Sequence, residues 1–276
     1  MKRSKLSQFA LKLCREAAQE IRHAAKPLRA RMKGRSTDLL TATDLRVEAF
    51  MRKQIRAMFP DHQIVGEEQS GTGPVDLARP TWFLDPVDGT TNYVHGLPFV
   101  ACNVAFWESG ALRLGVTADV RRRRLYWAES DRGSFMGRTR LKVSRTRTMN
   151  RAVVSTGFTT DRAENADNNI AEFCEVAPQT RDVRRIGCAG LDTAWVASGE
   201  LDAYWEQGNG PWDWAVGALL VREAGGKVTN YSGRDWMPGD TDFIASNGKV
   251  HDALLATIQQ VRKRLELSPS PSAAHS

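Results

Sequence analysis

The sequence contains few cysteines and histidines, and they show neither a CxxC pair nor the spacing of the common zinc sites. The four cysteines, at positions 14, 102, 174 and 188, form no CxxC pair, so we expect reduced thiols in a cytoplasmic protein. The five histidines include no HExxH pair and no other zinc-ligand spacing. Neither a disulfide-stabilised fold nor a zinc site of this kind is therefore expected.

Long apolar runs and the sequence signatures of a nucleophile are also absent. No run approaches the ~20 apolar residues of a membrane-spanning helix. Lys12 and Arg15 interrupt the apolar stretch near the N-terminus, which indicates an amphipathic helix and no secretory signal. Neither a GxSxG elbow nor a GxxxxGK phosphate loop occurs. These absences favour metal-activated water over covalent catalysis.

The chain does contain enough apolar material for a substantial core, and it carries an excess of positive charge. Hydrophobic residues make up 41% of the 276 positions, and eight residues are tryptophan, which suits one large domain or two packed halves. The 39 basic and 32 acidic residues give a net charge of +7, which suits an anionic ligand and permits weak nucleic-acid contact. The densest basic run, Arg121–Arg124, is more simply explained as a solvated turn.

Periodicity and turn residues predict an α+β fold. Apolar spacing over 6–28 predicts a first helix, and a second is expected from Thr43 or Asp44 to just before Pro60. Strands at 99–107 and 111–120 flank a hairpin turn at 108–110. Helices are then expected near 162–176, 188–198, 211–224 and 248–266, and strands near 152–158, 181–185, 201–206, 226–230 and 242–245. We expect one layered domain over 1–266 with two sheets, and a disordered tail over 267–276.

The stretch 81-TWFLDPVDGTTNYVHG-96 places two carboxylates, Asp85 and Asp88, at the end of an apolar strand. Two ionised carboxylates converging there repel each other unless a cation or a proton lies between them. Mg²⁺ is typically held by one or two such carboxylates together with substrate phosphate. Pro86 stiffens the turn, and Gly89 allows a ligand to approach the backbone. An Asx-type turn with capping acids explains the D-x-x-D pattern equally well when it is taken alone.

Two further acidic segments strengthen the metal interpretation. Glu67 and Glu68 follow Gly66 at the end of a short predicted strand, where sites in layered folds collect, although a solvated acidic pair is the commoner arrangement. Asp213 lies between two tryptophans inside an otherwise apolar helix, where a carboxylate is costly to bury unless it is paired or metal-bound. The alternative for Asp213 is an acid favoured by the helix N-terminus.

Four segments, taken together and in order, resemble the inositol monophosphatase family of Mg²⁺-dependent, lithium-sensitive phosphatases. The segments are 36-STDLLTATD-44, GEE at 66–68, 82-WFLDPVDGTTNYVHGLPF-99 and 212-WDWAVGALLVREAGG-226. The resemblance extends from about residue 5 to about residue 262. It implies a layered αβαβα sandwich, of the type shared by inositol monophosphatases and fructose-1,6-bisphosphatases, and a homodimer.

The resemblance also implies a set of two to three Mg²⁺ ions and their ligands. Glu68, Asp85 and the backbone carbonyl of Val87 would hold the first ion. Asp85, Asp88 and Asp213 would hold the second, and Glu68 would help to hold a weaker third.

Catalytic and substrate-binding roles follow from the same resemblance. Thr90, backed by Asp44, would orient and deprotonate the attacking water, with Glu68 as a further member of the catalytic set. Lys33 matches a mobile-loop lysine near the metals, whereas His95 is expected to be peripheral. The residues implied in substrate binding are Asp88, Gly89, Thr90, Gly187, Ala189, Glu206 and Asp213.

The expected activity is hydrolysis of inositol 1-phosphate, or a similar polyol monophosphate, by direct in-line attack of metal-activated water. Cys188 and Gly190 depart from the residues common in the family, which leaves the substrate selectivity open. Fructose-1,6-bisphosphatase or NADP phosphatase activity is the alternative within enzymes. A non-catalytic contact with RNA or the transcription machinery is the alternative in a different class, and a membrane association is not expected.

Overall fold

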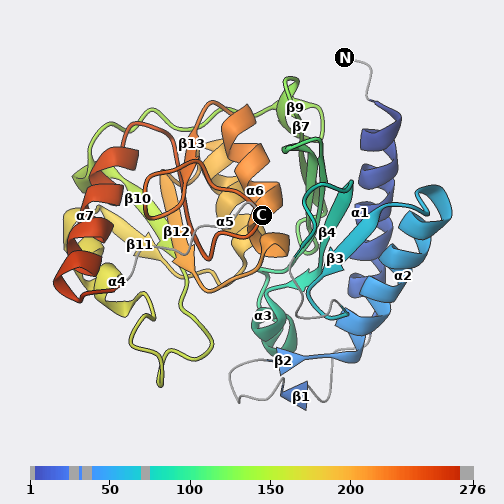
Figure 1. Cartoon of the computed structure of the whole chain (residues 1–276), viewed down its shortest axis with the longest axis horizontal. Helices are drawn as coiled ribbons and strands as arrows, with labels where there is room; N and C mark the ends of the chain where they lie inside the picture. Colours follow the sequence, from blue (N-terminus) through green and yellow to red (C-terminus); the bar gives the residue numbers. More distant parts are fainter. Residues whose placement is uncertain (1–3, 25–30, 33–38, 70–74, 268–276) are drawn as a thin grey trace.

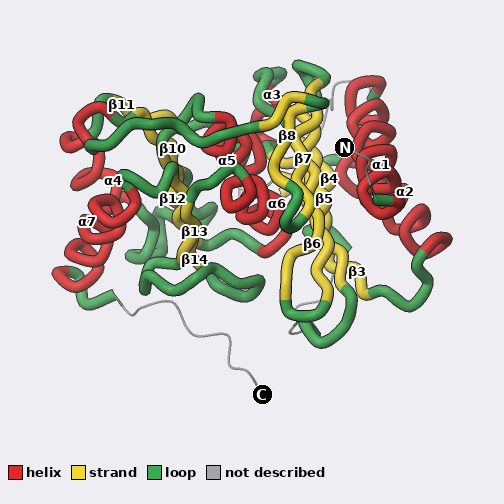
Figure 2. The backbone as a smooth tube through the Cα atoms, turned by 90° about the horizontal axis from the view of Figure 1, so that it is seen from above, coloured by secondary structure: helices red, strands yellow, loops and turns green. Residues whose placement is uncertain are grey.

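The computed structural model describes residues 4–24, 31–32, 39–69 and 75–267, and these residues form alternating layers of helices and strands (Figure 1). Figure 2 shows the same order of layers from above. Two helices cover a large sheet, two more lie between this sheet and a smaller one, and two cover the far face of the smaller sheet. The layered αβαβα sandwich is therefore confirmed. Lys33 and the tail residues 268–276 lie outside the described residues.

The first helical layer and the larger sheet form one half of the molecule. Helices α1 (Lys5–His23) and α2 (Ala42–Met58) pack on this sheet. The seven strands have the order β3-β4-β5-β6-β7-β8-β9. Their bounds are β3 (Gln63–Gly66), β4 (Thr81–Asp88), β5 (Ala101–Glu108), β6 (Ala111–Asp119), β7 (Arg124–Glu129), β8 (Gly133–Met136) and β9 (Thr139–Arg140). A short pair, β1 (Arg31–Met32) and β2 (Leu39–Leu40), lies outside this sheet.

The central layer contains α5 (Ala189–Ser198) and α6 (Pro211–Glu223), which contact both sheets. A short helix, α3 (Thr90–His95), follows β4 directly. Because helices cover both faces of the larger sheet, all eight residues of β4 are buried, including its two acids. This burial explains why the strand preceding the acids is continuously apolar.

The smaller sheet and the last helices form the other half. The five strands have the order β11-β10-β12-β14-β13, with parallel pairing of β10 to β11 and β12 and antiparallel pairing elsewhere. The strands are β10 (Val153–Thr156), β11 (Asp182–Arg184), β12 (Ala203–Gln207), β13 (Lys227–Thr229) and β14 (Asp242–Ser246). The outer elements are α4 (Ile170–Val176), α7 (His251–Arg264) and the single 3₁₀ turns η1 (Met149–Arg151) and η2 (Ala177–Gln179).

Three hydrophobic clusters separate the layers. One joins α1 and α2 to the larger sheet around Trp82, a second surrounds α5 and α6 around Trp214, and a third lies between the smaller sheet and the outer helices around Trp205. Of the four cysteines, Cys174 on α4 is exposed and the others are buried. Among the described residues, no helix is both long and apolar enough to cross a bilayer.

Most predicted elements agree with the structure, and one helix differs clearly. The helix expected near 162–176 begins only at Ile170, because the preceding segment folds into turns. The Asn168 side chain accepts the Ile170 N–H at 3.0 Å, and Asn and Asp side chains of this kind compete with helical hydrogen bonds. The first helix ends at His23, and the second begins earlier than expected, with Thr41 as its N-cap.

Candidate active site

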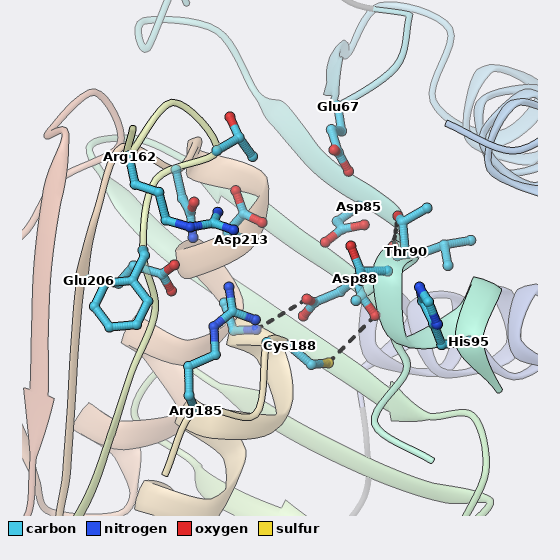
Figure 3. A pocket seen from close by; sticks show the side chains of 18 residues that line it. Glu67, Asp85, Asp88, Thr90, His95, Arg162, Arg185, Cys188, Glu206 and Asp213 are labelled. Carbon is cyan, nitrogen blue, oxygen red and sulfur yellow. Dashed lines mark hydrogen bonds between the residues drawn. The ribbon is translucent and has the colours of Figure 1, made fainter. Parts of the chain in front are cut away.

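A cavity of about 520 Å³ opens between the end of β4, the start of α6 and the loops of the smaller sheet. Figure 3 shows Glu67, Asp85 and Asp88 on one side of this cavity, Glu206 with the two arginines Arg162 and Arg185 on the other, and Asp213 between the two groups. The acids come from four separate positions in the chain. They are Glu67 after β3, Asp85 and Asp88 in β4, Asp213 in α6 and Glu206 in β12.

Asp88 ends β4, and three donors fix its carboxylate. The side chain of Asn103 donates to Oδ2 at 2.9 Å, and the Gly190 N–H donates to the same oxygen at 2.6 Å. The Ala189 N–H donates to Oδ1 at 3.1 Å. Burial raises the pKa of Asp88, and hydrogen bonds from these donors lower it in part. The start of α5 therefore orients this carboxylate before any ligand arrives.

Asp85 lies three residues before Asp88, and its carboxylate has fewer hydrogen-bond donors. Its side chain is buried, and no described residue forms a hydrogen bond with Oδ1. Burial raises its pKa well above the usual range, and the charges of Glu67, Asp88 and Asp213 raise it further. A buried carboxylate oxygen without a donor is costly, so this atom requires a proton or a cation.

Asp213 approaches the same space from the central layer. It is the third residue of α6, after Pro211, and its Oδ2 accepts the Gly210 N–H at 2.9 Å. Burial raises its pKa well above the usual range, followed by repulsion from Glu67 and Asp88. Asp213 therefore caps its helix, as the simpler sequence interpretation proposed, and also faces the other acids.

The two acids of the GEE segment differ in position. Glu67 lines the cavity, and its charge raises the pKa of both Asp85 and Asp213. Glu68 is not among the cavity-lining residues, and its backbone N–H donates to Glu48 Oε2 at 2.8 Å. The geometry therefore brings Glu67 to the other acids, whereas the resemblance assigned metal binding to Glu68.

The acid cluster fits a hard divalent cation. The charges of Glu67 and Asp88 raise the pKa of both Asp85 and Asp213. Among the described residues, no donor reaches the buried Oδ1 of Asp85. Both features suit Mg²⁺, which takes carboxylate and carbonyl oxygens. In the part of the chain that the structure describes, no three His, Cys, Asp or Glu side chains already form a metal-binding group. The acids therefore surround the cavity without meeting at one point.

Thr90 and Asp44 form a second polar group beside the acids. The Thr90 hydroxyl lies 3.1 Å from Asp44 Oδ1 and 2.9 Å from the carbonyl oxygen of Val87, and it can donate to either. Asp44 is buried at the start of α2, where its Oδ2 also accepts the hydroxyl and, at 3.0 Å, the N–H of Thr41. Burial raises the pKa of Asp44, and the hydrogen bonds from Thr41 and Thr90 oppose this rise.

The turn between β4 and α3 depends on Gly89. Its φ of 86° lies in the left-handed region, which favours glycine. A Cβ atom at this position would also lie only 2.6 Å from the carbonyl oxygen of Phe99. A larger residue would therefore displace the turn that presents Thr90 to the cavity.

The opposite wall combines a carboxylate with two guanidinium groups. Burial raises the pKa of Glu206 to about 7, while the hydroxyl of Tyr204, which donates to Oε2, and the charge of Arg185 lower it. Arg185 and Arg162 line the cavity, and neither forms an ion pair with another described residue. The cavity can therefore accommodate both hydroxyl groups and negative charge at this end.

Several further residues line the cavity, and not all of them were predicted as site residues. Gly187 and Ala189 line the cavity as expected. His95 also lines it, from an exposed position at the end of α3 (Figure 3), and its peripheral role stays a prediction. Sequence reasoning did not include Arg162 or Arg185 among the site residues, because the loops that carry them have no local pattern linking them to the acids. Cys188, buried at the start of α5, donates its thiol to the Asp88 carbonyl at 3.5 Å.

Comparison with known proteins gives consistent matches. The profile of the inositol monophosphatase family matches residues 2–263. An inositol-1-monophosphatase of Synechocystis is 39% identical over 80% of this chain and 77% of its own. The Nus factor SuhB of Pseudomonas aeruginosa is 38% identical over 80% of this chain and 83% of its own. The solved IMPase of Thermotoga maritima superposes with a TM-score of 0.84 at 30% identity, over 95% of this chain and 100% of that one.

Proposed function

We propose, from the premise that this chain belongs to the inositol monophosphatase family, that its acid-lined cavity hydrolyses inositol 1-phosphate or a similar polyol monophosphate. The observation that carries the proposal is the unsatisfied, buried Oδ1 of Asp85 within a cluster of four carboxylates. Such a cluster suits metal-bound phosphate, because the cations bridge the negative charges of protein and substrate.

Mg²⁺, in two to three ions, is the proposed cofactor. The side chains of Glu67, Asp85, Asp88 and Asp213, with the Val87 carbonyl, would hold it. When bound, Mg²⁺ neutralises phosphate charge, activates water and stabilises the departing alkoxide. Glu67 replaces Glu68 in this set because only Glu67 lines the cavity.

Thr90 and Asp44 are proposed to handle the proton of the attacking water. When the Thr90 hydroxyl donates to Asp44, its oxygen keeps lone pairs that can accept a hydrogen bond from water. The water oxygen then forms the new P–O bond while the ester oxygen leaves from the opposite face. The released proton passes through Thr90 to Asp44, whose raised pKa favours uptake. No phosphoenzyme is expected.

The far wall is proposed to select the substrate. Glu206 would accept hydrogen bonds from the substrate hydroxyls. Arg162 and Arg185 line the same end of the cavity, where their guanidinium groups could bind a second phosphate. They therefore favour, as the alternative, substrates that carry more than one phosphate group. Fructose 1,6-bisphosphate and NADP are the bisphosphate or multiphosphate candidates. An Arg185→Gln variant should lose activity on such substrates selectively if this alternative is correct.

The direct test is phosphate release from a panel with and without Mg²⁺. The panel contains inositol 1-phosphate, fructose 1,6-bisphosphate, NADP, histidinol phosphate and 3′-phosphoadenosine 5′-phosphate. We expect Mg²⁺-dependent preference for inositol 1-phosphate, and loss of all turnover in Asp88→Asn. The exposed acid Asp252 of α7 provides the control, because Asp252→Asn should retain full activity. Activity that survives in Asp88→Asn would contradict the metal assignment.

A second candidate function is contact with RNA or the transcription machinery, as the name of one relative suggests. The segment 138–151 favours it, because it contains no acid and carries exposed basic residues that form no ion pair with any described residue. These residues are Arg138, Arg140, Lys142, Arg145, Arg147 and Arg151. In Figure 1 the segment leaves β9 on the side of the molecule opposite α3, so it lies away from the acid-lined cavity.

Binding of labelled single-stranded RNA in a salt titration tests this second function. An Arg145→Gln/Arg147→Gln variant should weaken binding and flatten its salt dependence, with phosphatase activity unchanged. An Arg121→Gln/Arg123→Gln variant removes the same charge from another exposed turn and should bind as the wild type does. If both variants weaken RNA binding equally, the binding depends on the net charge of the protein and not on the 138–151 segment.

We also propose that Li⁺ inhibits the activity, that the protein is a homodimer and that it is cytoplasmic. All three follow from the resemblance to the family. Titration of Li⁺ against turnover and light scattering of the purified chain test the first two. Turnover unaffected by Li⁺ at high millimolar concentration, or a monomeric mass, would remove the corresponding part of the proposal without affecting the rest.

A further inference from the structure

A buried carboxylate outside the cavity holds the turn that carries Glu67. Glu48, on α2, is fully buried, and its Oε1 accepts from Arg52 Nε at 2.7 Å. Arg52 also donates to the carbonyl of Ile64 in β3 at 3.2 Å. This pair therefore connects α2 to the strand that leads into the GEE segment.

The remaining acceptor capacity of Glu48 is directed at the turn itself. Its Oε2 accepts the N–H of Glu68 at 2.8 Å, and its Oε1 accepts the N–H of Gln69 at 3.1 Å. On the other side, the Glu67 N–H donates to the carbonyl of Leu84 in β4 at 3.1 Å. The backbone around Glu67 is thus held from both directions, by β4 and by a side chain of α2.

Gly66 permits this contact by its lack of a side chain. A Cβ atom at this position would lie 2.5 Å from Oε1 of Glu48 and 3.0 Å from a guanidinium nitrogen of Arg52. Any larger residue would therefore have to move a buried, hydrogen-bonded pair. A glycine at position 66 therefore lets the Glu48 carboxylate reach the backbone N–H of Glu68.

We propose that Glu48 is a positioning residue for the metal ligand Glu67, and that Mg²⁺ affinity depends on it although it does not line the cavity. The inference rests on the proposed function, because it takes Glu67 as a ligand. Loss of the Glu48 carboxylate leaves backbone donors of the turn without their acceptor, and the Glu67 side chain then loses its fixed direction toward Asp85. A purely structural ion pair would affect stability alone.

The test is isothermal titration calorimetry of Mg²⁺ into the full-length protein, with no substrate present. Glu48→Gln should weaken Mg²⁺ binding by about 10–100-fold, the range for residues that orient a metal ligand. Glu172→Gln provides the matched control, because Glu172 is also buried and lies 3.4 Å from a buried arginine, Arg262, in the other half of the molecule. This control should lose stability and keep its Mg²⁺ affinity.

A Glu67→Gln variant separates failure of this inference from failure of the proposed function. If Glu67→Gln weakens Mg²⁺ binding and Glu48→Gln does not, the positioning role is overturned and the metal site stands. If Glu67→Gln has no effect, both are overturned. In the double variant, Glu48→Gln should add nothing to the effect of Glu67→Gln, because both act on the same ligand. Additive losses would contradict the inference.

Gly66→Ala tests the same contact if Glu48→Gln does not fold. This variant keeps both carboxylates and displaces Glu48 only by steric overlap. It should weaken Mg²⁺ binding in the same direction as Glu48→Gln, and unchanged affinity in a folded Gly66→Ala protein would overturn the proposal.

Discussion

The Thr90 hydroxyl lies between two acceptors, Asp44 and the Val87 carbonyl, at 3.1 and 2.9 Å. One proton can serve only one of these acceptors at a time. The choice matters for the proposed mechanism, since donation to Asp44 would lead the water proton toward a carboxylate, whereas donation to Val87 would occupy a carbonyl proposed as a metal ligand. At the residue scale, the proposed mechanism therefore depends on the direction in which the Thr90 hydroxyl donates its proton.

Thr90→Ala should lower kcat by about 10²–10⁴-fold, the usual contribution of a positioned acid–base group. Thr90→Ser keeps the hydroxyl and should retain most of the activity. Initial rates at saturating Mg²⁺ measure both variants, with thermal unfolding as a check of folding. A wild-type kcat in Thr90→Ala would remove Thr90 and Asp44 from the proton path.

The buried His251 leads us to predict that the free energy of unfolding depends on pH. It is fully buried at the start of α7, with its ring nitrogens 2.9 Å from the hydroxyl oxygens of Thr229 and Ser246. Burial lowers its pKa from 6.5 to about 4. Between these values the unfolded chain binds more protons, so the free energy of unfolding falls as pH falls through this window. The loss is on the order of 3 kcal/mol.

Urea denaturation of the wild type and His251→Asn across this pH range measures the effect. The variant lacks the titrating ring, so the difference in unfolding free energy between the two proteins should shrink as the solution becomes acidic. A constant difference from neutral pH to about pH 4 would contradict the prediction. Other titrating groups are common to both proteins and cancel in the comparison.

At the scale of elements, the side chain of Asp44 at the start of α2 both caps the helix and belongs to the proposed proton path. Asp44 is the third residue of α2, and the reciprocal hydrogen bonds between Thr41 and Asp44 form a capping box. The same carboxylate accepts from Thr90 through its other oxygen. The cap thus fixes the direction in which Asp44 meets the cavity.

Thr41→Ala should therefore affect stability and activity together. We expect a loss of about 1 kcal/mol in unfolding free energy, typical of a lost N-cap. We also expect a reduced kcat, because the Asp44 carboxylate loses the hydrogen bond from the Thr41 hydroxyl and keeps, of its two contacts with Thr41, only the one from the backbone N–H. Thr41→Ser should preserve both quantities. Urea denaturation and steady-state kinetics on the same preparations provide the measurement, and a destabilised variant with unchanged kcat would separate the cap from catalysis.

Elements with strong local signals could be predicted from the sequence. Helix α6 has Pro211 at its start and a long apolar run, and the hairpin of β5 and β6 has Gly110 in its turn, so local chemistry determines both. The segment before Ile170 was predicted as helix although it is rich in Asn and Asp, whose side chains form hydrogen bonds with the backbone in turns.

Only part of the candidate site could be predicted from local sequence patterns. Asp85 and Asp88 stand out in the sequence because they lie three residues apart at the end of one apolar strand. The sequence pattern alone does not distinguish Glu67 from Glu68, since the choice depends on a long-range contact with Glu48. Arg185 reaches the cavity through a loop whose position only the packed layers determine.

At the scale of the whole molecule, the four acids come from different layers. Glu67, Asp85 and Asp88 belong to the larger sheet and the turn that follows β3, whereas Asp213 belongs to the central helix α6. Their mutual repulsion therefore acts between layers, and a shared cation would draw these layers together. Stability and metal binding are expected to be linked.

Asp213→Asn tests this linkage, because the amide can still accept the Gly210 N–H while one charge is removed. In chelator, the variant should unfold at a temperature equal to or above that of the wild type. In excess Mg²⁺ the order should reverse, since a ligand at a hundred times its Kd adds about 2.7 kcal/mol to the stability of a protein that binds it. Differential scanning calorimetry measures both conditions, and the same order in both would contradict the prediction.

The distribution of thiols gives the native chain a convenient spectroscopic label. Cys174 is exposed on α4, and the other three cysteines are buried. Helix α4 directly follows the 159–169 segment, which brings Arg162 to the cavity. Among the described cysteines, a maleimide fluorophore should therefore attach at Cys174 without any engineered cysteine, next to a loop that lines the cavity. Its emission during a phosphate-ester titration would report ligand occupancy in real time.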